Sequence, residues 1–135
     1  MIVVNAETAP QDLNDIRVLV VEDEALVAMN LEMMLEDFGC AVIGPAMRFD
    51  KAKELLENGV DADVAILDVN VGGTPVFPLA ELLVQQNIPM VFATGYDRSG
   101  IPEEWHHRPI LQKPYTADDV QRGISQALAN AAAAK

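Results

Sequence analysis

The fold of this chain is constrained most by three short runs of consecutive apolar residues, at residues 18–21, 64–67 and 90–93. The first two runs are rich in β-branched side chains, which favour strands. Apolar runs of this length are typical of strands that are buried on both faces of a parallel sheet. Weaker candidates at residues 41–43 and 109–112 complete a set of five strands.

Four further stretches have helical character, and they cover residues 25–38, 50–57, 78–86 and 117–128. We expect Asp50 and Thr116 to be N-caps, because their side-chain oxygens can accept hydrogen bonds from the free N–H groups of a first turn. Between Thr94 and His107 the sequence is rich in turn residues. Any helix in that interval is therefore expected to be short.

The first helical stretch carries an apolar face at helical spacing that begins at Leu26, and Gly39 is expected to end the helix. Met29 and Met33 flank this face. Because methionine fills irregular interiors well, we expect both to pack in the core, with a groove for a partner as the alternative. Cys40, the only cysteine, is expected to be a small buried apolar residue.

Strands that alternate with helices predict an α/β fold with a parallel sheet and right-handed crossovers. We expect a flavodoxin-like (βα)5 three-layer sandwich whose five-stranded sheet has the order 2-1-3-4-5. The domain is expected to cover residues 16–130. A flexible leader (residues 1–15) would precede it, and a frayed alanine-rich tail (residues 131–135) would follow.

Charge and hydropathy narrow the class of partner. The formal net charge of −12 and the pI near 4.3 argue against a nucleic acid or an anionic membrane, because both are bound through clustered Lys and Arg. No apolar run approaches the roughly 18 residues that span a bilayer, and the first residues lack the features of a secretory signal. We therefore expect a cytoplasmic protein whose partners are proteins or small ligands.

Polar residues follow four of the five predicted strands, and these residues are Glu22, Asp23, Glu24, Asp68, Thr94 and Lys113. The carboxyl ends of parallel strands meet at one edge of a sheet, which is where ligands bind in such folds. Carboxylates gathered there raise one another's pKa unless a cation neutralises them, and oxygen ligands suit Mg²⁺ or Mn²⁺. Asp68 is the natural nucleophile for phosphoryl transfer, with Asn70, Gly72 and Gly73 behind it to turn a loop over the site.

The segments VLVVEDE, AILDVNVGG, FATGYD and LQKP stand in this order between residues 17 and 128. Together they resemble the receiver domain of two-component response regulators. The resemblance implies that Asp68 is phosphorylated and that Glu22 and Asp23 hold Mg²⁺. It also implies that the backbone carbonyl of Asn70 is a further metal ligand.

The same resemblance implies that Thr94 and Lys113 contact the phosphoryl group, and that a cis peptide bond precedes Pro114. Ile110 departs from the family, because many receivers have a Tyr or Phe there that swings inward on activation. The segment FATGY instead resembles the FAT GUY subgroup, in which the glycine after the threonine makes the next loop pliable. Gly95 and Tyr96 are then the expected switch, with Tyr96 either reporting activation or only covering the loop.

By this resemblance the chain is a stand-alone response regulator that is phosphorylated by a histidine kinase or a histidine phosphotransfer protein. It would signal by protein contacts or act as a phosphate sink or shuttle, and it would catalyse only its own phosphorylation and slow dephosphorylation. Three alternatives are a degenerate receiver that binds partners without phosphorylation, an aspartate-nucleophile phosphohydrolase and a flavodoxin-like cofactor binder. The phosphohydrolase lacks its second acid at Asn70, and the acids at residues 22–24 would repel a cofactor phosphate.

The pair His106 and His107, next to Trp105, offers no spacing typical of a structural metal site. We expect these three residues to belong to a surface patch that contacts a partner.

Overall fold

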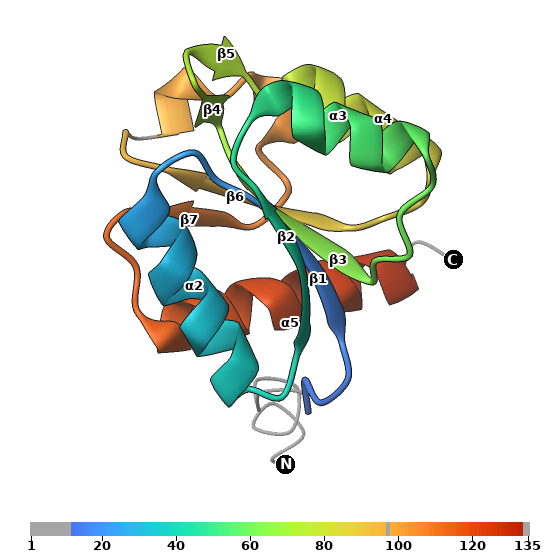
Figure 1. The fold of residues 1–135 in the computed structure, drawn as a ribbon, viewed down its shortest axis with the longest axis vertical. Helices are drawn as coiled ribbons and strands as arrows, with labels where there is room; N and C mark the ends of the chain where they lie inside the picture. Colours follow the sequence, from blue (N-terminus) through green and yellow to red (C-terminus); the bar gives the residue numbers. More distant parts are fainter. Residues whose placement is uncertain (1–11, 97, 134–135) are drawn as a thin grey trace.

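The computed structural model describes residues 12–96 and 98–133, which form a parallel sheet between two layers of helices (Figure 1). The strands of this sheet are β1 (Arg17–Val21), β2 (Ala41–Ala46), β3 (Val64–Asp68), β6 (Met90–Thr94) and β7 (Ile110–Gln112). Their order is β2-β1-β3-β6-β7, and all four pairings are parallel. Counted along the main sheet alone, this is the predicted order 2-1-3-4-5, so the flavodoxin-like class is confirmed.

The helices are α2 (Ala25–Asp37), α3 (Phe49–Glu57), α4 (Phe77–Gln85) and α5 (Ala117–Ala133). In Figure 1 the helices α3 and α4 lie on one face of the sheet and α2 and α5 on the other. The buried side chains of each pair pack in a separate core. Each strand supplies both cores, because successive side chains point to opposite faces: Leu19 joins one core, and Val18 and Val20 join the other. No helix among the described residues has the length and apolar character of a membrane span.

The expected short segment before His107 consists of two 3-10 turns, η1 (Arg98–Gly100) and η2 (Glu103–Trp105). An unexpected hairpin of β4 (Asn70–Val71) and β5 (Thr74–Pro75) follows β3. Both irregular segments stand at the carboxyl edge of the sheet. The loops there are therefore more elaborate than the alternation of strands and helices indicated.

The prediction that Leu26, Met29 and Met33 face the core is wrong, since their side chains are 70%, 50% and 58% exposed. The buried residues of α2 are Ala28, Leu31 and Leu35. At about 100° per residue these three lie on the side of the helix opposite the exposed three. The small side chain of Ala28 completes the buried face.

The predicted cap at Asp50 is also wrong, because α3 begins at Phe49 and the cap position is Arg48, without a side-chain cap bond. Asp50 lies one residue inside the first turn, where its carboxylate accepts the Lys51 N–H (2.9 Å). Thr116, in contrast, caps α5 as predicted. Its Oγ1 accepts the Asp119 N–H (3.1 Å), and its own N–H donates to Asp119 (2.9 Å).

Trp105 is not part of a surface patch, because only 4% of it is exposed. Its ring lies 6.2 Å from the ring of Phe77 and 5.8 Å from that of Phe92, measured between centroids, and the guanidinium of Arg108 lies over it. Burial of this large aromatic ring removes much apolar surface from water, which favours its place in the core. His107 is exposed, as predicted.

Of the predicted leader, residues 1–11 lie outside the described part of the chain. Within residues 12–15, Leu13 is buried, and the Asp15 N–H donates to the Gly39 carbonyl (2.9 Å). Cys40 is buried beside Leu13, which confirms its expected packing role. At the other end, α5 continues through Ala133, and residues 134–135 of the predicted tail are not described.

Candidate functional site

The carboxyl edge of the sheet brings together the polar residues that follow its strands. Glu22 and Asp23 come directly after β1, and Asp68 is the last residue of β3. Thr94 ends β6, and Lys113 follows β7. Glu22, Asp68 and Thr94 are the buried polar residues of the described chain, with 2%, 7% and 3% of their surfaces exposed. Burial of polar groups at one edge marks it as the candidate site.

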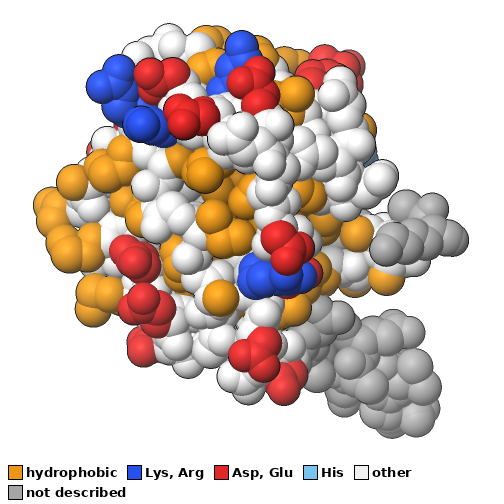
Figure 2. Space-filling view, turned by 45° about the vertical axis from the view of Figure 1, so that its right-hand side comes forward, with side chains coloured by type: hydrophobic (Ala, Val, Ile, Leu, Met, Phe, Trp, Pro, Cys, Tyr) orange, Lys and Arg blue, Asp and Glu red, His pale blue; other side chains and the backbone are white. Residues whose placement is uncertain are grey.

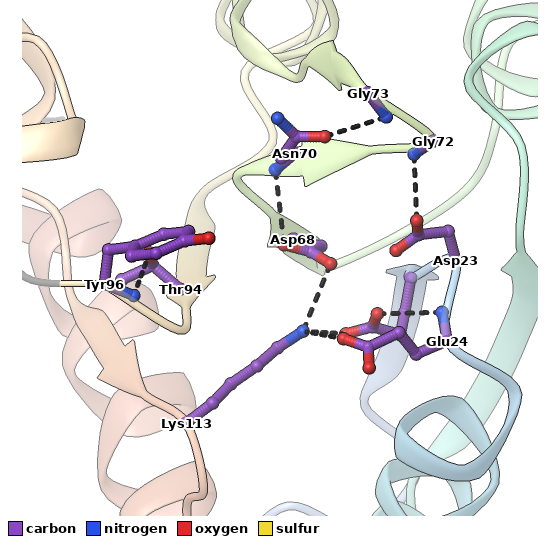
Figure 3. Close-up of polar contacts among 10 residues, drawn as sticks. Asp23, Glu24, Asp68, Asn70, Gly72, Gly73, Thr94, Tyr96 and Lys113 are labelled. Carbon is purple, nitrogen blue, oxygen red and sulfur yellow. Dashed lines mark hydrogen bonds and ion pairs between the residues drawn. The ribbon is translucent and has the colours of Figure 1, made fainter.

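Lys113 joins the carboxylates of this edge to one another (Figure 3). Its Nζ lies 3.0 Å from Oε1 of Glu22, 3.1 Å from Oδ2 of Asp68 and 3.2 Å from Oε1 of Glu24. The Lys113 N–H also donates to the Thr94 carbonyl (2.8 Å), which holds the residue against β6. A single cation therefore faces three carboxylates.

The surroundings of Glu22 raise the pKa of its carboxyl group. Burial and the neighbouring negative charge of Asp68 raise the pKa of Glu22 to about 7, although hydrogen bonds from the Glu24 N–H and Lys113 oppose the rise. The pKa of Lys113 is lowered by burial, but the hydrogen bonds and charges of Glu22 and Asp68 outweigh this, so the pKa is raised overall. The charge of Asp68 contributes to both directions, because it adds to burial in disfavouring the ionised form of Glu22 and favours the charged form of Lys113.

The loop after β3 turns back over Asp68. The Asn70 N–H donates to Oδ1 of Asp68 (3.2 Å), and Oδ1 of Asn70 accepts the Gly73 N–H (2.9 Å). Gly72 and Gly73 have φ angles of 59° and 88°, in the region that favours glycine, as the predicted turn requires. The Gly72 N–H donates to Oδ2 of Asp23 (2.9 Å), so the loop is tied to the acidic residues after β1.

Asp23 differs from Glu22 in its ionisation. Burial raises the pKa of Asp23, but the hydrogen bond from the Gly72 N–H and the contacts with Asp68 and Glu22 hold it below its ordinary value overall. This carboxylate stays ionised near neutral pH. It is thus a persistent anionic ligand beside Glu22.

The donor set fits a divalent metal ion. Glu22, Asp23, Glu24 and Asp68 each offer a carboxylate oxygen, and these four oxygens lie within 4.8 Å of one another. Among the described residues, only Lys113 forms ion pairs with members of this cluster, so four carboxyl groups share one cation. All four donors are oxygens, which suits Mg²⁺ or Mn²⁺ better than a softer metal.

Thr94 lies at this edge with its hydroxyl engaged elsewhere. Its Oγ1 accepts the Tyr96 N–H (3.0 Å), and none of the hydrogen bonds among the described residues joins Thr94 to Asp68. Tyr96 is 80% exposed, so its ring does not contribute to the buried site. Ile110 is half-buried in β7 and packs against the core that contains Trp105. The peptide bond before Pro114 is cis, as the resemblance implied.

Two residues of the site were assigned neither as metal ligands nor as phosphoryl contacts from the sequence. Glu24 contacts Lys113, and the only signal for it was its place as the third acid of residues 22–24. Tyr115 carries the one buried side-chain polar atom without a hydrogen-bond partner in the described part of the chain, its hydroxyl. Burial, followed by the charge of Glu22, raises the pKa of Tyr115 to about 12. Nothing in the sequence distinguishes this tyrosine from an ordinary surface residue.

Comparison with known proteins places the chain in a family. No family model matches the sequence. The phyllosphere-induced regulator PhyR of Methylorubrum extorquens is 30% identical over 117 residues, which cover 82% of this chain and 43% of PhyR. The chain spans about half the length of the curated relatives it matches.

Two solved structures are matched over nearly their whole length. SdrG of Sphingomonas melonis is 39% identical with a TM-score of 0.72, and the match covers 87% of this chain and 97% of SdrG. The receiver domain of the PhyR response regulator of Erythrobacter litoralis is 27% identical with a TM-score of 0.72, over 87% of this chain and 93% of that domain. These matches, the strand order and the polar residues at the carboxyl edge lead to one conclusion: the chain belongs to the CheY-like receiver-domain family of response regulators.

Proposed function

We propose that this chain is a receiver that accepts a phosphoryl group on Asp68 from a histidine kinase or a histidine phosphotransfer protein. The contact between Lys113 Nζ and Asp68 Oδ2 (3.1 Å) at the acidic edge of the sheet is the observation that carries the proposal. A nucleophilic carboxylate must meet a cation that can also bind the incoming phosphoryl oxygens. Lys113 contacts the carboxylate of Asp68, and its side-chain nitrogen would lie within reach of the oxygens of a phosphoryl group on that carboxylate.

The reaction is a transfer of one phosphoryl group between two nucleophiles. A carboxylate oxygen of Asp68 attacks the phosphorus of a phosphohistidine, so an O–P bond forms as the P–N bond breaks. The imidazole leaves with the electron pair of that bond and takes a proton from solvent. Lys113 and the hydroxyl of Thr94 donate hydrogen bonds to the oxygens of the transferred group.

A Mg²⁺ or Mn²⁺ ion held by Glu22, Asp23 and Asp68, with the backbone carbonyl of Asn70 as a further ligand, would neutralise charge on those oxygens. Asp23 provides an anion that persists at neutral pH. The Gly72 N–H fixes the orientation of its carboxylate. The loop after β3 is thereby positioned together with the ligands.

The output would pass through Gly95 and Tyr96. The Thr94 hydroxyl now accepts the Tyr96 N–H, and a rotation toward a phosphoryl group would break that bond. The backbone at Gly95 and Tyr96 would then lose the hydrogen bond between the Tyr96 N–H and Thr94. The Tyr96 ring is 80% exposed in this structure, so a protein partner can reach it, and a change in the backbone of this loop would move it. This is a two-state loop that a new charge biases.

The proposal is tested by incubating the protein with acetyl phosphate and Mg²⁺ and measuring its intact mass. We expect the gain of one phosphoryl group, none without metal, and none in Asp68→Asn. Asp37→Asn, an exposed position at the end of α2, is the matched control and should gain the group as the natural chain does. A mass gain in Asp68→Asn, or none in the natural chain, would contradict the proposal.

A further inference from the structure

Glu24 is the acidic residue of the site that has no part in the proposed phosphoryl transfer. It occupies the N-cap position of α2, but its side chain makes no cap hydrogen bond. Its Oε1 instead lies 3.2 Å from Nζ of Lys113, on the side of the site where Asp68 ends β3 (Figure 3). The side chain of Glu24 is 63% exposed, whereas Asp68 is buried. Glu24 therefore lies between the proposed phosphoacceptor and the solvent from which a phosphodonor arrives.

Lys113 is shared between Glu24 and Asp68. Its Nζ lies 3.1 Å from Oδ2 of Asp68 while it contacts Oε1 of Glu24. An ion pair with one exposed partner contributes little, so the lysine can exchange Glu24 for another anion. A phosphoryl group on Asp68 would need the same nitrogen. Glu24 thus competes with that group for Lys113.

Glu24 is also the carboxylate that the other charges of the site would leave unbalanced. A divalent ion and Lys113 together carry three positive charges, and Glu22, Asp23 and Asp68 carry three negative charges when all are ionised. The Glu24 N–H donates to Oε2 of Glu22 (3.1 Å), which holds residue 24 beside these acids. A carboxylate oxygen of Glu24 lies within 4.8 Å of theirs. A phosphodonor would therefore meet one unbalanced negative charge close to Asp68.

The rest of the protein adds to the repulsion of an anionic donor. The formal net charge is −12. On the face drawn in Figure 2 the blue side chains of Lys and Arg lie beside red acidic ones, so that face offers an anion no separate basic patch. Among the described residues, Lys113 alone forms ion pairs with the acids of the site. The balance between Lys113 and Glu24 should therefore decide which phosphodonors approach Asp68.

We propose that Glu24 is a specificity-determining residue: its carboxylate competes for Lys113 and disfavours strongly anionic phosphodonors relative to donors with a positive charge beside the phosphoryl group. The inference rests on the proposed phosphorylation of Asp68. A free acyl phosphate belongs to the disfavoured class. A phosphohistidine protein with a cationic side chain that reaches Glu24 belongs to the favoured class. That side chain would replace Lys113 at Glu24 and release it for the phosphoryl oxygens.

The test compares two small donors of different charge. Acetyl phosphate is a dianion near neutral pH, whereas phosphoramidate has a protonated nitrogen and a smaller net charge. An O–P bond to Asp68 forms as the P–O or P–N bond of the donor breaks, and acetate or ammonia leaves with the electron pair. The rate of mass gain with Mg²⁺ is measured for the natural chain, Glu24→Gln, Glu24→Asp and Glu36→Gln. The last variant removes an exposed acid in the final turn of α2.

Glu24→Gln should react about fivefold faster with acetyl phosphate but only about twofold faster with phosphoramidate, because loss of the charge favours the more anionic donor. Glu24→Asp keeps the charge and should restore the preference of the natural chain between the two donors. Glu36→Gln changes the net charge equally but should leave that preference unchanged. The effect of Glu24→Gln should shrink in about 1 M salt, which screens exposed charges.

Mg²⁺ affinity separates this role from metal ligation. It is measured by titration of ¹⁵N-labelled protein without any phosphodonor. Glu24→Gln should weaken Mg²⁺ binding no more than about threefold, whereas Asp23→Asn should weaken it at least about tenfold. Circular dichroism of each variant establishes that the fold is kept.

Four results would overturn the inference while leaving phosphorylation of Asp68 intact. They are an unchanged rate of Glu24→Gln with acetyl phosphate, an equal gain with both donors, the same change of preference in Glu36→Gln, and a loss of Mg²⁺ affinity in Glu24→Gln as large as in Asp23→Asn. Failure of the natural chain to gain a phosphoryl group from either donor would contradict the proposed function itself.

Discussion

The side-chain nitrogen of Lys113 lies 3.1 Å from Oδ2 of Asp68, so the proposed phosphoacceptor is already paired with a cation that is itself largely buried. The same nitrogen reaches Glu22 at 3.0 Å. Lys113 thus compensates the buried negative charge of Glu22 and Asp68 in this structure. After phosphorylation it would form an ion pair with the oxygens of the phosphoryl group.

Replacing Lys113 by Met should destabilise the metal-free protein by about 3 kcal/mol, because Glu22 and Asp68 would remain buried without their partner. Urea unfolding near neutral pH in the presence of a chelator measures this change. Lys53→Met is the control, because its pair with Glu57 (3.9 Å) is exposed and should contribute less than about 0.5 kcal/mol. Equal losses in the two variants would contradict the assigned role of Lys113.

Mg²⁺ should raise the midpoint of thermal unfolding, since four carboxylate oxygens lie within 4.8 Å of one another. At a concentration 100-fold above the dissociation constant, the stabilisation should be about 2.7 kcal/mol. Asp23→Asn should lose most of this response, whereas Asp37→Asn should keep it. A full response in Asp23→Asn would show that the ion binds elsewhere.

Trp105 should report phosphorylation by its fluorescence. It is the only tryptophan of the chain, and its ring packs on Phe92, two residues before Thr94, and on Phe77, which follows the hairpin after Asp68. Movement of either segment would alter the packing around the indole. We expect an intensity change with acetyl phosphate and Mg²⁺ that is absent in Asp68→Asn. An identical change in that variant would mean that the signal comes from the reagents.

The ion pair of Arg17 with Asp63 should make stability depend on pH. The hydrogen bonds from Arg17 lower the pKa of Asp63 below its ordinary value of 3.8, although burial opposes them. A carboxyl whose pKa is depressed by folding contributes stability above its unfolded pKa and loses it as the pH falls through the folded value. The contribution is therefore complete at about pH 7 and declines below about pH 4.

A double-mutant cycle with Arg17→Gln and Asp63→Asn measures this effect. The coupling energy from urea unfolding should be favourable at about pH 7 and smaller at about pH 3. The same coupling at both values would show that the interaction does not involve the ionised carboxylate.

Much of the fold could be predicted because its signals are local. The apolar runs before Asp68 and Thr94 identify central strands, and alternation with helices implies a parallel sheet. That sheet carries Glu22, Asp68 and Lys113 to one edge without any knowledge of their contacts. The cap at Thr116 could also be predicted because its signal is local, since its partner Asp119 lies only three residues later.

The remaining features depend on tertiary packing. Leu26 and Met33 were assigned to the core because an apolar stripe alone does not show which of its residues meet the sheet. The buried face of α2 instead includes the small residue Ala28. Trp105 was placed on the surface because its aromatic neighbours, Phe77 and Phe92, are distant in the sequence. The hydroxyl of Tyr115 and the contact of Glu24 with Lys113 likewise exist only once the strands are assembled.

The two ends of the described chain leave the domain far from Asp68. The backbone enters β1 beside Gly39, at the amino edge of the sheet, and the last turns of α5 line a hollow with Pro89 and Met90 at the same edge. Both described ends therefore lie at the edge of the sheet opposite to the acidic residues. A phosphodonor that approaches the acidic edge would therefore meet neither described end of the chain.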